Sequence, residues 1–526
     1  MKGFAEWARV QRRVYLGNAT SVRDFRAQLR GNRPILLWSI YLGLLVLFVV
    51  LAYSNIVAQG QQSVTVVQTQ LKSFYKSILW MLEVMVALVA PVIVAMSIQS
   101  EVQRKSYDLI ATSPVTPKYY LIGKVLSGYR YVLMLIFLSL PVTAAAVVLG
   151  GATYGEVFIS YFMIAMHGLL YIAISLPIAV ISTKVVPAVI YSYTACWGYA
   201  LFASAGAAMY MSRSMWMGGP QEEAPFYALL TPAMIETPVD AHTSLGKLSV
   251  PNWILATAVI LVIVRFMVVG AGSAMTRKGS KETASLRIHG LVITAVITGI
   301  AALSQFSIMG TFTTMGASSS GGGAQELCIF FTVLSLPLIF ALPNLSTWSY
   351  VDEHKHRPGG IFDVRQLLSG APEGGLPYLL ALLATMFAVG SGVLVYFGGA
   401  IDAVSIVYFV WLTGCWVFVW AIGWLVSSFT RTGAGTAKKS HIASTVIIGL
   451  LPWPFLSIVT AMSEADWLDV FRIYPFAGFL YNLSDLDTVV LMVFELWVAA
   501  AALTIWAEFR RRSVVSLYKR ALNARQ

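Results

Sequence analysis

The chain has 526 residues, of which 58% are hydrophobic and 11% are charged, and its mean hydropathy is +0.73. A soluble domain carries about 25% charged residues, so this composition excludes a water-soluble enzyme, a disordered regulator and a nucleic-acid-binding domain. The net charge of +12 comes mainly from basic residues outside the apolar runs, which is typical of membrane topology and not of nucleic-acid binding.

An apolar helix of about 20 residues crosses a bilayer, and repeated apolar runs of this length predict an all-α, polytopic membrane protein. We expect about twelve transmembrane helices in two six-helix repeats. Their predicted ranges are 35–58, 78–98, 119–149, 157–182, 185–211, 252–273, 290–311, 327–349, 377–398, 403–429, 441–462 and 488–508.

Four parts follow along the chain. Residues 1–33 alternate apolar and basic residues near helical spacing, which predicts a cytoplasmic amphipathic segment in the membrane interface; the alternative is a simple basic anchor. Residues 34–273 form the first six-helix unit, 274–289 a cytoplasmic linker, and 290–526 the second unit. The two halves share the same order of long and short connections, which favours a parallel repeat.

Lys and Arg predict the orientation, because cytoplasmic loops are enriched in these residues. With the N-terminus inside, 29 of the 36 basic residues lie on the cytoplasmic side and five on the other. We therefore expect a multi-pass protein of the plasma (inner) membrane with both termini in the cytoplasm.

The most specific stretch lies between the second and third predicted helices. It contains Glu101-Val-Gln-Arg104, then Asp108-Leu-Ile-Ala-Thr-Ser-Pro114-Val-Thr-Pro117-Lys118, and a Gly-Lys pair at the start of the next helix. The prolines end a short amphipathic helix, since the residue before a proline is disfavoured in helical geometry. This pattern predicts a short charged helix that projects from the bilayer, where a cytoplasmic partner could push on it.

In these residues the chain resembles the membrane subunits of ABC-type exporters of the second architectural class. The resemblance implies a permease with six helices per half, an amphipathic helix before the first crossing, and a small outer helical insertion before the sixth. It also implies separate P-loop ATPase subunits that seat against the cytoplasmic loops. The coupling residues that it implies are Glu101, Arg104, Asp108, Pro114, Pro117, Lys118 and, in the second half, Glu353, Arg357 and Asp363.

The chain itself lacks the Gly-x-x-x-x-Gly-Lys-Ser/Thr loop that cradles phosphates. We therefore expect a permease and not an enzyme, with no cofactor bound by this chain and with ATP and Mg handled by the partner. The other expected partners are the lipid bilayer, an exported substrate and a second permease chain; no nucleic acid and no metal are expected.

An ionisable residue inside a predicted span costs free energy when it enters the bilayer, and each one therefore prompts a functional hypothesis. Glu83, His167 and Glu495 are candidates for the translocation path. The alternative is that each is hydrogen-bonded between helices, and for His167 a packing role is more common than a ligand role.

Two other functions remain open. An ion-coupled secondary transporter also has twelve helices in two halves, but it should concentrate ionisable residues at mid-membrane. A membrane enzyme acting on lipid-linked substrates would need a convergent set of acid–base or nucleophilic groups, and no such spacing is evident in the sequence.

Overall fold

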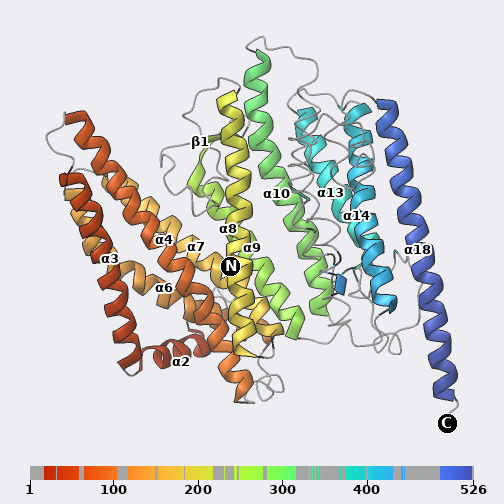
Figure 1. The fold of residues 1–526 in the computed structure, drawn as a ribbon, viewed down its shortest axis with the longest axis horizontal. Coiled ribbons are helices and arrows are strands. Elements are labelled where there is room, and N and C mark those ends of the chain that lie inside the picture. The colour runs from red at the N-terminus through yellow and green to blue at the C-terminus, as the bar shows by residue number, and fades with distance from the viewer. Residues whose placement is uncertain are drawn as a thin grey trace, which may run out of the picture. The chain divides into compact units, whose positions relative to one another are not determined.

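The computed structural model describes most of the predicted helices (Figure 1). The chain divides into two compact units, Met1–Arg277 and Lys278–Gln526, and each is described by itself. The described residues are 17–30, 32–58, 64–104, 116–148, 152–182, 184–216, 230, 242–245, 248–275, 281–314, 331, 334–335, 338, 342, 345, 364, 367–368, 374–396, 401, 403–429, 440–441, 444 and 486–523.

Unit 1 is a helical bundle with one short hairpin. Its described helices are α2 (Ala19–Gln28), α3 (Asn32–Ala58), α4 (Val64–Gln103), α6 (Pro117–Val148), α7 (Tyr154–Ile181), α8 (Val185–Trp216) and α9 (Asn252–Met275). Strands β1 (His242–Leu245) and β2 (Leu248–Pro251) pair antiparallel just before α9. α2 is short and lies across the end of the bundle where α3 begins (Figure 1).

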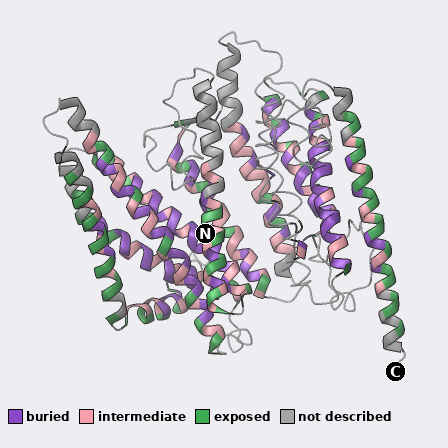
Figure 2. Cartoon of the chain, in the orientation of Figure 1, coloured by how far each residue is buried: buried purple, intermediate pink, exposed green. Residues whose placement is uncertain are grey.

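Helix α7 is the centre of unit 1. It packs against α4, α6, α8 and α9, and its side chains are buried on every face along much of its length (Figure 2). Its start is fixed locally, because Thr153 and Glu156 form a capping box, each side chain bonding the other's backbone N–H. The sequence therefore builds a central helix that carries His167 and Tyr171 in the interior.

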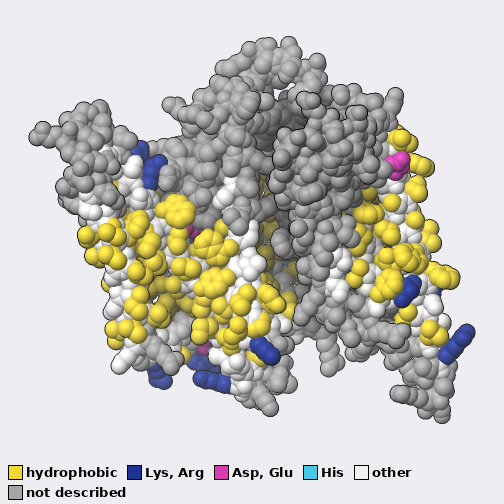
Figure 3. All heavy atoms as spheres, viewed as in Figure 1, with side chains coloured by type: hydrophobic (Ala, Val, Ile, Leu, Met, Phe, Trp, Pro, Cys, Tyr) yellow, Lys and Arg dark blue, Asp and Glu magenta, His cyan; other side chains and the backbone are white. Residues whose placement is uncertain are grey.

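The outer face of unit 1 is apolar. On α3, Ile35, Leu36, Leu37 and Leu47 are each more than half exposed, and hydrophobic side chains cover the middle of the visible face, with Lys and Arg toward its two ends (Figure 3). A contiguous apolar surface of this extent is suited to lipid and not to water. Within the described residues, seven helices are long and apolar enough to cross a membrane, so the chain is an all-α, polytopic membrane protein.

Unit 2 contains α10 (Lys281–Thr314), α13 (Gly375–Tyr396), α14 (Ala403–Phe429) and α18 (Leu486–Asn523). α14 packs against α18 and α13, and α10 packs against α13. Helix α14 carries three tryptophans that follow one another by one turn and are fully buried in the core of unit 2: Trp416, Trp420 and Trp424. Trp420 donates a hydrogen bond to the Leu345 carbonyl at 3.3 Å, which satisfies the polar end of a large apolar side chain.

Several boundaries differ from the predicted ones. α4 begins at Val64 and not at 78, and α10 begins at Lys281, so much of the predicted linker 274–289 is helical. The hairpin β1–β2 lies just before the sixth helix of unit 1, and most of the segment in which a small helical insertion was expected lies outside the described residues, so that insertion stays a prediction. The predicted spans 327–349 and 441–462 lie largely outside the described residues, so twelve helices in two repeats stays a prediction, as do the four domain ranges and the orientation.

Candidate functional site

The predicted coupling residues of the first half lie at and between the end of α4 and the start of α6. Glu101 lies in the last turn of α4, and Pro117 is the first residue of α6. Thr116 caps α6, since its Oγ1 accepts the Tyr119 N–H at 3.4 Å, and proline at the first helical position lacks a donor that would have been unpaired there. The other coupling residues fall in two groups: Arg104 and Lys118 are exposed, whereas Asp108, Pro114, Glu353, Arg357 and Asp363 lie outside the described residues.

Lys124 is the centre of this region. Its side chain is 1% exposed, and its Nζ lies 2.6 Å from Asp24 Oδ2 and 3.0 Å from Glu101 Oε1. It also donates to Ser97 Oγ at 2.9 Å. A buried ammonium needs such partners because desolvation penalises the unpaired charge. Lys124 on α6 therefore joins the end of α4 to the short helix α2.

Glu101 is held from three sides. Besides Lys124, it accepts a hydrogen bond from the Tyr120 hydroxyl at 2.5 Å and another from Arg23 at 2.6 Å. Arg23 also contacts Asp24 at 2.9 Å. Partial burial opposes the charge on Arg23, but hydrogen bonds and charges from Asp24 and Glu101 outweigh it and raise the pKa of the guanidinium. We call Arg23, Asp24, Glu101, Tyr120 and Lys124 the ion cluster.

Helix α2 docks on α6 through a polar face. Asn18 caps α2 by accepting the Ser21 N–H at 3.2 Å, and its side-chain amide donates to the Tyr119 carbonyl at 3.0 Å. Gly123 on α6 makes this approach possible, because a Cβ there would lie 2.6 Å from Asn18 Oδ1. The predicted segment 1–33 thus contains a helix. Asp24 of α2 meets the buried Lys124, Phe25 packs against the apolar core of unit 1, and the side chains of Arg23 and Arg26 are exposed.

A second polar contact joins the C-terminal end of α4 to the C-terminal end of α7. Gln99 is fully buried, and its amide nitrogen donates to the carbonyls of Ala179 and Ser182, each at 2.8 Å. These carbonyls lie at the C-terminus of α7, where no further helical turn supplies donors. Gln99 therefore closes the end of the central helix against α4.

The interior candidates separate into two sets. Glu83 on α4 and His167 on α7 are brought together, with His167 Nδ1 3.2 Å from Glu83 Oε1, and both side chains are buried. Tyr171 donates to the same oxygen at 3.0 Å. Glu495 lies on an exposed face of α18 in unit 2. The sequence singled out Glu83 and His167 separately, and the structure makes them one pair.

Sequence reasoning did not assign a role at the site to Asp24, Tyr120, Lys124 or Gln99. Two signals were present: Lys124 follows Gly123 in the motif itself, and Asp24 is the only acidic residue of α2. The pairing required the fold, because Asp24 and Lys124 are 100 positions apart in the sequence. The described residues contain no group of three His, Cys, Asp or Glu side chains that could hold a metal ion.

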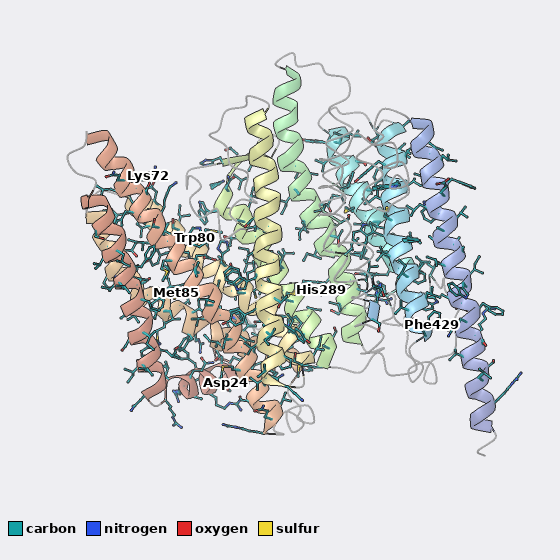
Figure 4. All side chains as sticks on the ribbon, viewed as in Figure 1. Asp24, Lys72, Trp80, Met85, His289 and Phe429 are labelled. Carbon is teal, nitrogen blue, oxygen red and sulfur yellow. The ribbon has the colours of Figure 1, made fainter. Side chains whose placement is uncertain are left out.

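Figure 4 shows Asp24, which belongs to the ion cluster, at the opposite end of unit 1 from Lys72, with Met85 between them. The ion cluster therefore lies at one end of the bundle. Comparisons with protein-family models, with curated proteins and with solved structures find no match to this chain.

Proposed function

We propose that this chain is the membrane-spanning permease subunit of an ATP-driven exporter of the ABC type. Separate P-loop ATPase subunits would act on the segment between α4 and α6, and the helical units would form the path of the exported substrate. The apolar helices are suited to span the bilayer. The sequence contains no nucleotide-binding loop of the Gly-x-x-x-x-Gly-Lys-Ser/Thr type. The proposal therefore requires a partner for ATP hydrolysis.

The observation that carries the proposal is the ion cluster. A force applied to residues 105–115 reaches the end of α4 and the start of α6 directly along the chain. Lys124 ties both ends to each other and to α2 through contacts of 2.6 and 3.0 Å. Such a junction resists separation of its parts, because pulling either carboxylate away from Lys124 leaves a buried charge unpaired. Motion of the connecting segment would thus move three helices together.

The proposal is tested by purifying the tagged chain from its native membranes in mild detergent. We expect a P-loop ATPase to co-purify, with ATP hydrolysis that depends on the presence of this chain. Asp108→Ala and Glu101→Gln should weaken this coupling while leaving membrane insertion intact. Glu156→Gln is the matched control, because Glu156 is a half-buried carboxylate at the start of α7 and belongs to the capping box instead of the ion cluster.

Absence of any co-purifying ATPase, or full ATPase coupling in both Asp108→Ala and Glu101→Gln, would contradict the proposal. Unfolding of each variant is followed in parallel, so that a loss of coupling is separated from a loss of the folded bundle. The purified chain alone in proteoliposomes should move no solute under an ion gradient.

An ion-coupled secondary transporter is the second candidate, and the buried Glu83–His167 pair is the observation that favours it. Transport driven by a proton gradient in proteoliposomes that contain only this chain would decide for it. Transport that requires ATP and the co-purified partner would decide for the exporter.

A further inference from the structure

Helix α18 of unit 2 has one uncovered side. It packs on α14, and many side chains away from this contact are exposed (Figure 2). Large apolar side chains are exposed on it as far as Phe509: Val490, Leu491, Phe494, Val498, Ile505, Trp506 and Phe509. Leu491 and Phe509 lie about 27 Å apart along the helix axis, which is close to the thickness of the hydrocarbon core of a bilayer. Residues 490–507 contain a single ionisable residue, Glu495, so this side of α18 is suited to lipid.

The charge of α18 changes directly after this apolar stretch. Residues 508–512 contain one glutamate and three arginines. Glu508 accepts hydrogen bonds from Arg511 at 2.7 Å and from Arg512 at 2.9 Å. The segment keeps an excess of positive charge, and Lys and Arg side chains are visible toward this end of α18 in Figure 3. A change from apolar to basic is typical of the level at which hydrocarbon gives way to lipid headgroups.

Arg510 is the arginine of this segment that Glu508 does not engage. Its guanidinium carbon lies 3.7 Å from the centroid of the Phe429 ring, and Phe429 is the last residue of α14. Its Nε is buried with no hydrogen-bond partner among the described residues. Stacking covers one face of the planar guanidinium and leaves the terminal N–H groups directed along its edge. A half-buried cation in this position is stabilised by an anion that accepts from these N–H groups.

Aromatic side chains surround this arginine. Trp506, one turn before Arg510, meets the edge of the Phe429 ring, with the ring centroids 6.3 Å apart and the planes at 83°. Trp506 is 52% exposed and Phe429 is 49% exposed, and Figure 4 shows Phe429 at the end of α14 beside α18. Tryptophan is enriched where apolar chains meet headgroups, because its ring is amphipathic. We call Phe429, Trp506 and Arg510 the arginine–aromatic site.

We propose that the arginine–aromatic site binds the headgroup of an anionic phospholipid. The phosphate accepts hydrogen bonds from the terminal N–H groups of Arg510, a geometry that suits arginine and phosphate. The acyl chains lie along the exposed apolar side chains of α18 that precede the site. A lipid fits better than a soluble anion, because the site is continuous with an apolar surface of membrane thickness. The inference concerns this chain alone and is independent of the proposed ATPase partner.

The experiment measures lipid binding to the purified full chain in mild detergent by native mass spectrometry. The chain is titrated with phosphatidylglycerol, which is anionic, or with phosphatidylcholine, which has no net charge. Wild type should bind the first phosphatidylglycerol more tightly than the first phosphatidylcholine. In Arg510→Gln, the Kd for phosphatidylglycerol should rise about tenfold, because a charge-assisted hydrogen bond to the phosphate is lost, whereas the Kd for phosphatidylcholine should change little.

Arg520→Gln is the matched control. It removes the same charge from an exposed arginine of α18 that lies about 15 Å further along the helix, so the Kd for phosphatidylglycerol should change less than about twofold. Inorganic phosphate, compared with chloride at equal ionic strength, should not displace the lipid. Displacement by inorganic phosphate would assign the site to a free anion and overturn the proposal.

Equal binding of phosphatidylglycerol by wild type and folded Arg510→Gln would also overturn it, as would equal affinity of wild type for the two lipids. If Arg510→Gln does not fold, Arg510→Lys decides. It keeps the charge but lacks the planar fork, so the Kd must rise at least about threefold, and an unchanged Kd refutes the site. A dimer of this chain that Arg510→Gln abolishes, with unchanged lipid binding, would assign the surface to a second copy instead.

Discussion

Replacement of Lys124 should destabilise the fold, because its ammonium is buried between two carboxylates. Lys124→Met keeps the unbranched stem but removes the charge. Asp24 and Glu101, whose side chains are 10% and 13% exposed, then keep Arg23, which is 59% exposed, and Glu101 keeps the hydrogen bond from the Tyr120 hydroxyl. The substitution therefore leaves negative charge in a poorly hydrated place.

The expected loss of stability follows from this burial. Removing one partner of a buried ion pair lowers the free energy of unfolding by about 3–5 kcal/mol. The carboxylates retain some contact with water and Arg23 remains, so we expect a loss of about 3 kcal/mol, near the lower end. The triple variant Lys124→Met, Asp24→Asn, Glu101→Gln removes the unpaired charges and should recover most of the loss.

The assay is reversible unfolding in mixed micelles at pH 7, together with amide hydrogen exchange of α2. Lys72→Met is the control, since Lys72 is exposed and its loss should change the free energy of unfolding by less than about 0.5 kcal/mol. Exchange of α2 should rise in Lys124→Met but not in Lys72→Met. A loss below 1 kcal/mol with unchanged exchange in α2, or a triple variant less stable than Lys124→Met, would refute the assigned role of Lys124.

Three further predictions concern close packing and buried hydrogen bonds. Gly123→Ala should undock α2 and raise its amide exchange, because the new Cβ meets α2 atoms at 2.6 and 2.8 Å, whereas Gly272→Ala, with its nearest atom at 3.9 Å, should not. Gln99→Leu removes the side-chain donor from one buried and one part-buried carbonyl and should lower the free energy of unfolding by about 2 kcal/mol, measured in the same micelles; an unchanged midpoint would argue against this contact. Gly390→Ala should destabilise unit 2 by about 1–3 kcal/mol, because a Cβ would lie 2.7 Å from the ring of Phe331; a thermal unfolding temperature equal to wild type would contradict the packing.

The class of fold could be predicted from the sequence with little difficulty. Apolar runs of about 20 residues specify membrane helices by length and hydropathy alone, and α3, α7, α9, α13 and α14 lie where those runs lie. Helix ends were harder to predict. α4 and α10 begin well before the predicted apolar runs, because stretches of mixed polarity at 64–77 and 281–289 continue the helix without lengthening the apolar run.

The amino-acid sequence by itself determined that the chain spans a membrane, which residues are costly to bury, and that a charged motif follows the second crossing. Only the tertiary structure decided which of those residues meet. Asp24 with Lys124, and Glu83 with His167, are 100 and 84 positions apart, and hydropathy has no information on the rotation of one helix against another. Local pattern specifies each helix, whereas a buried charge finds its partner only when the helices pack.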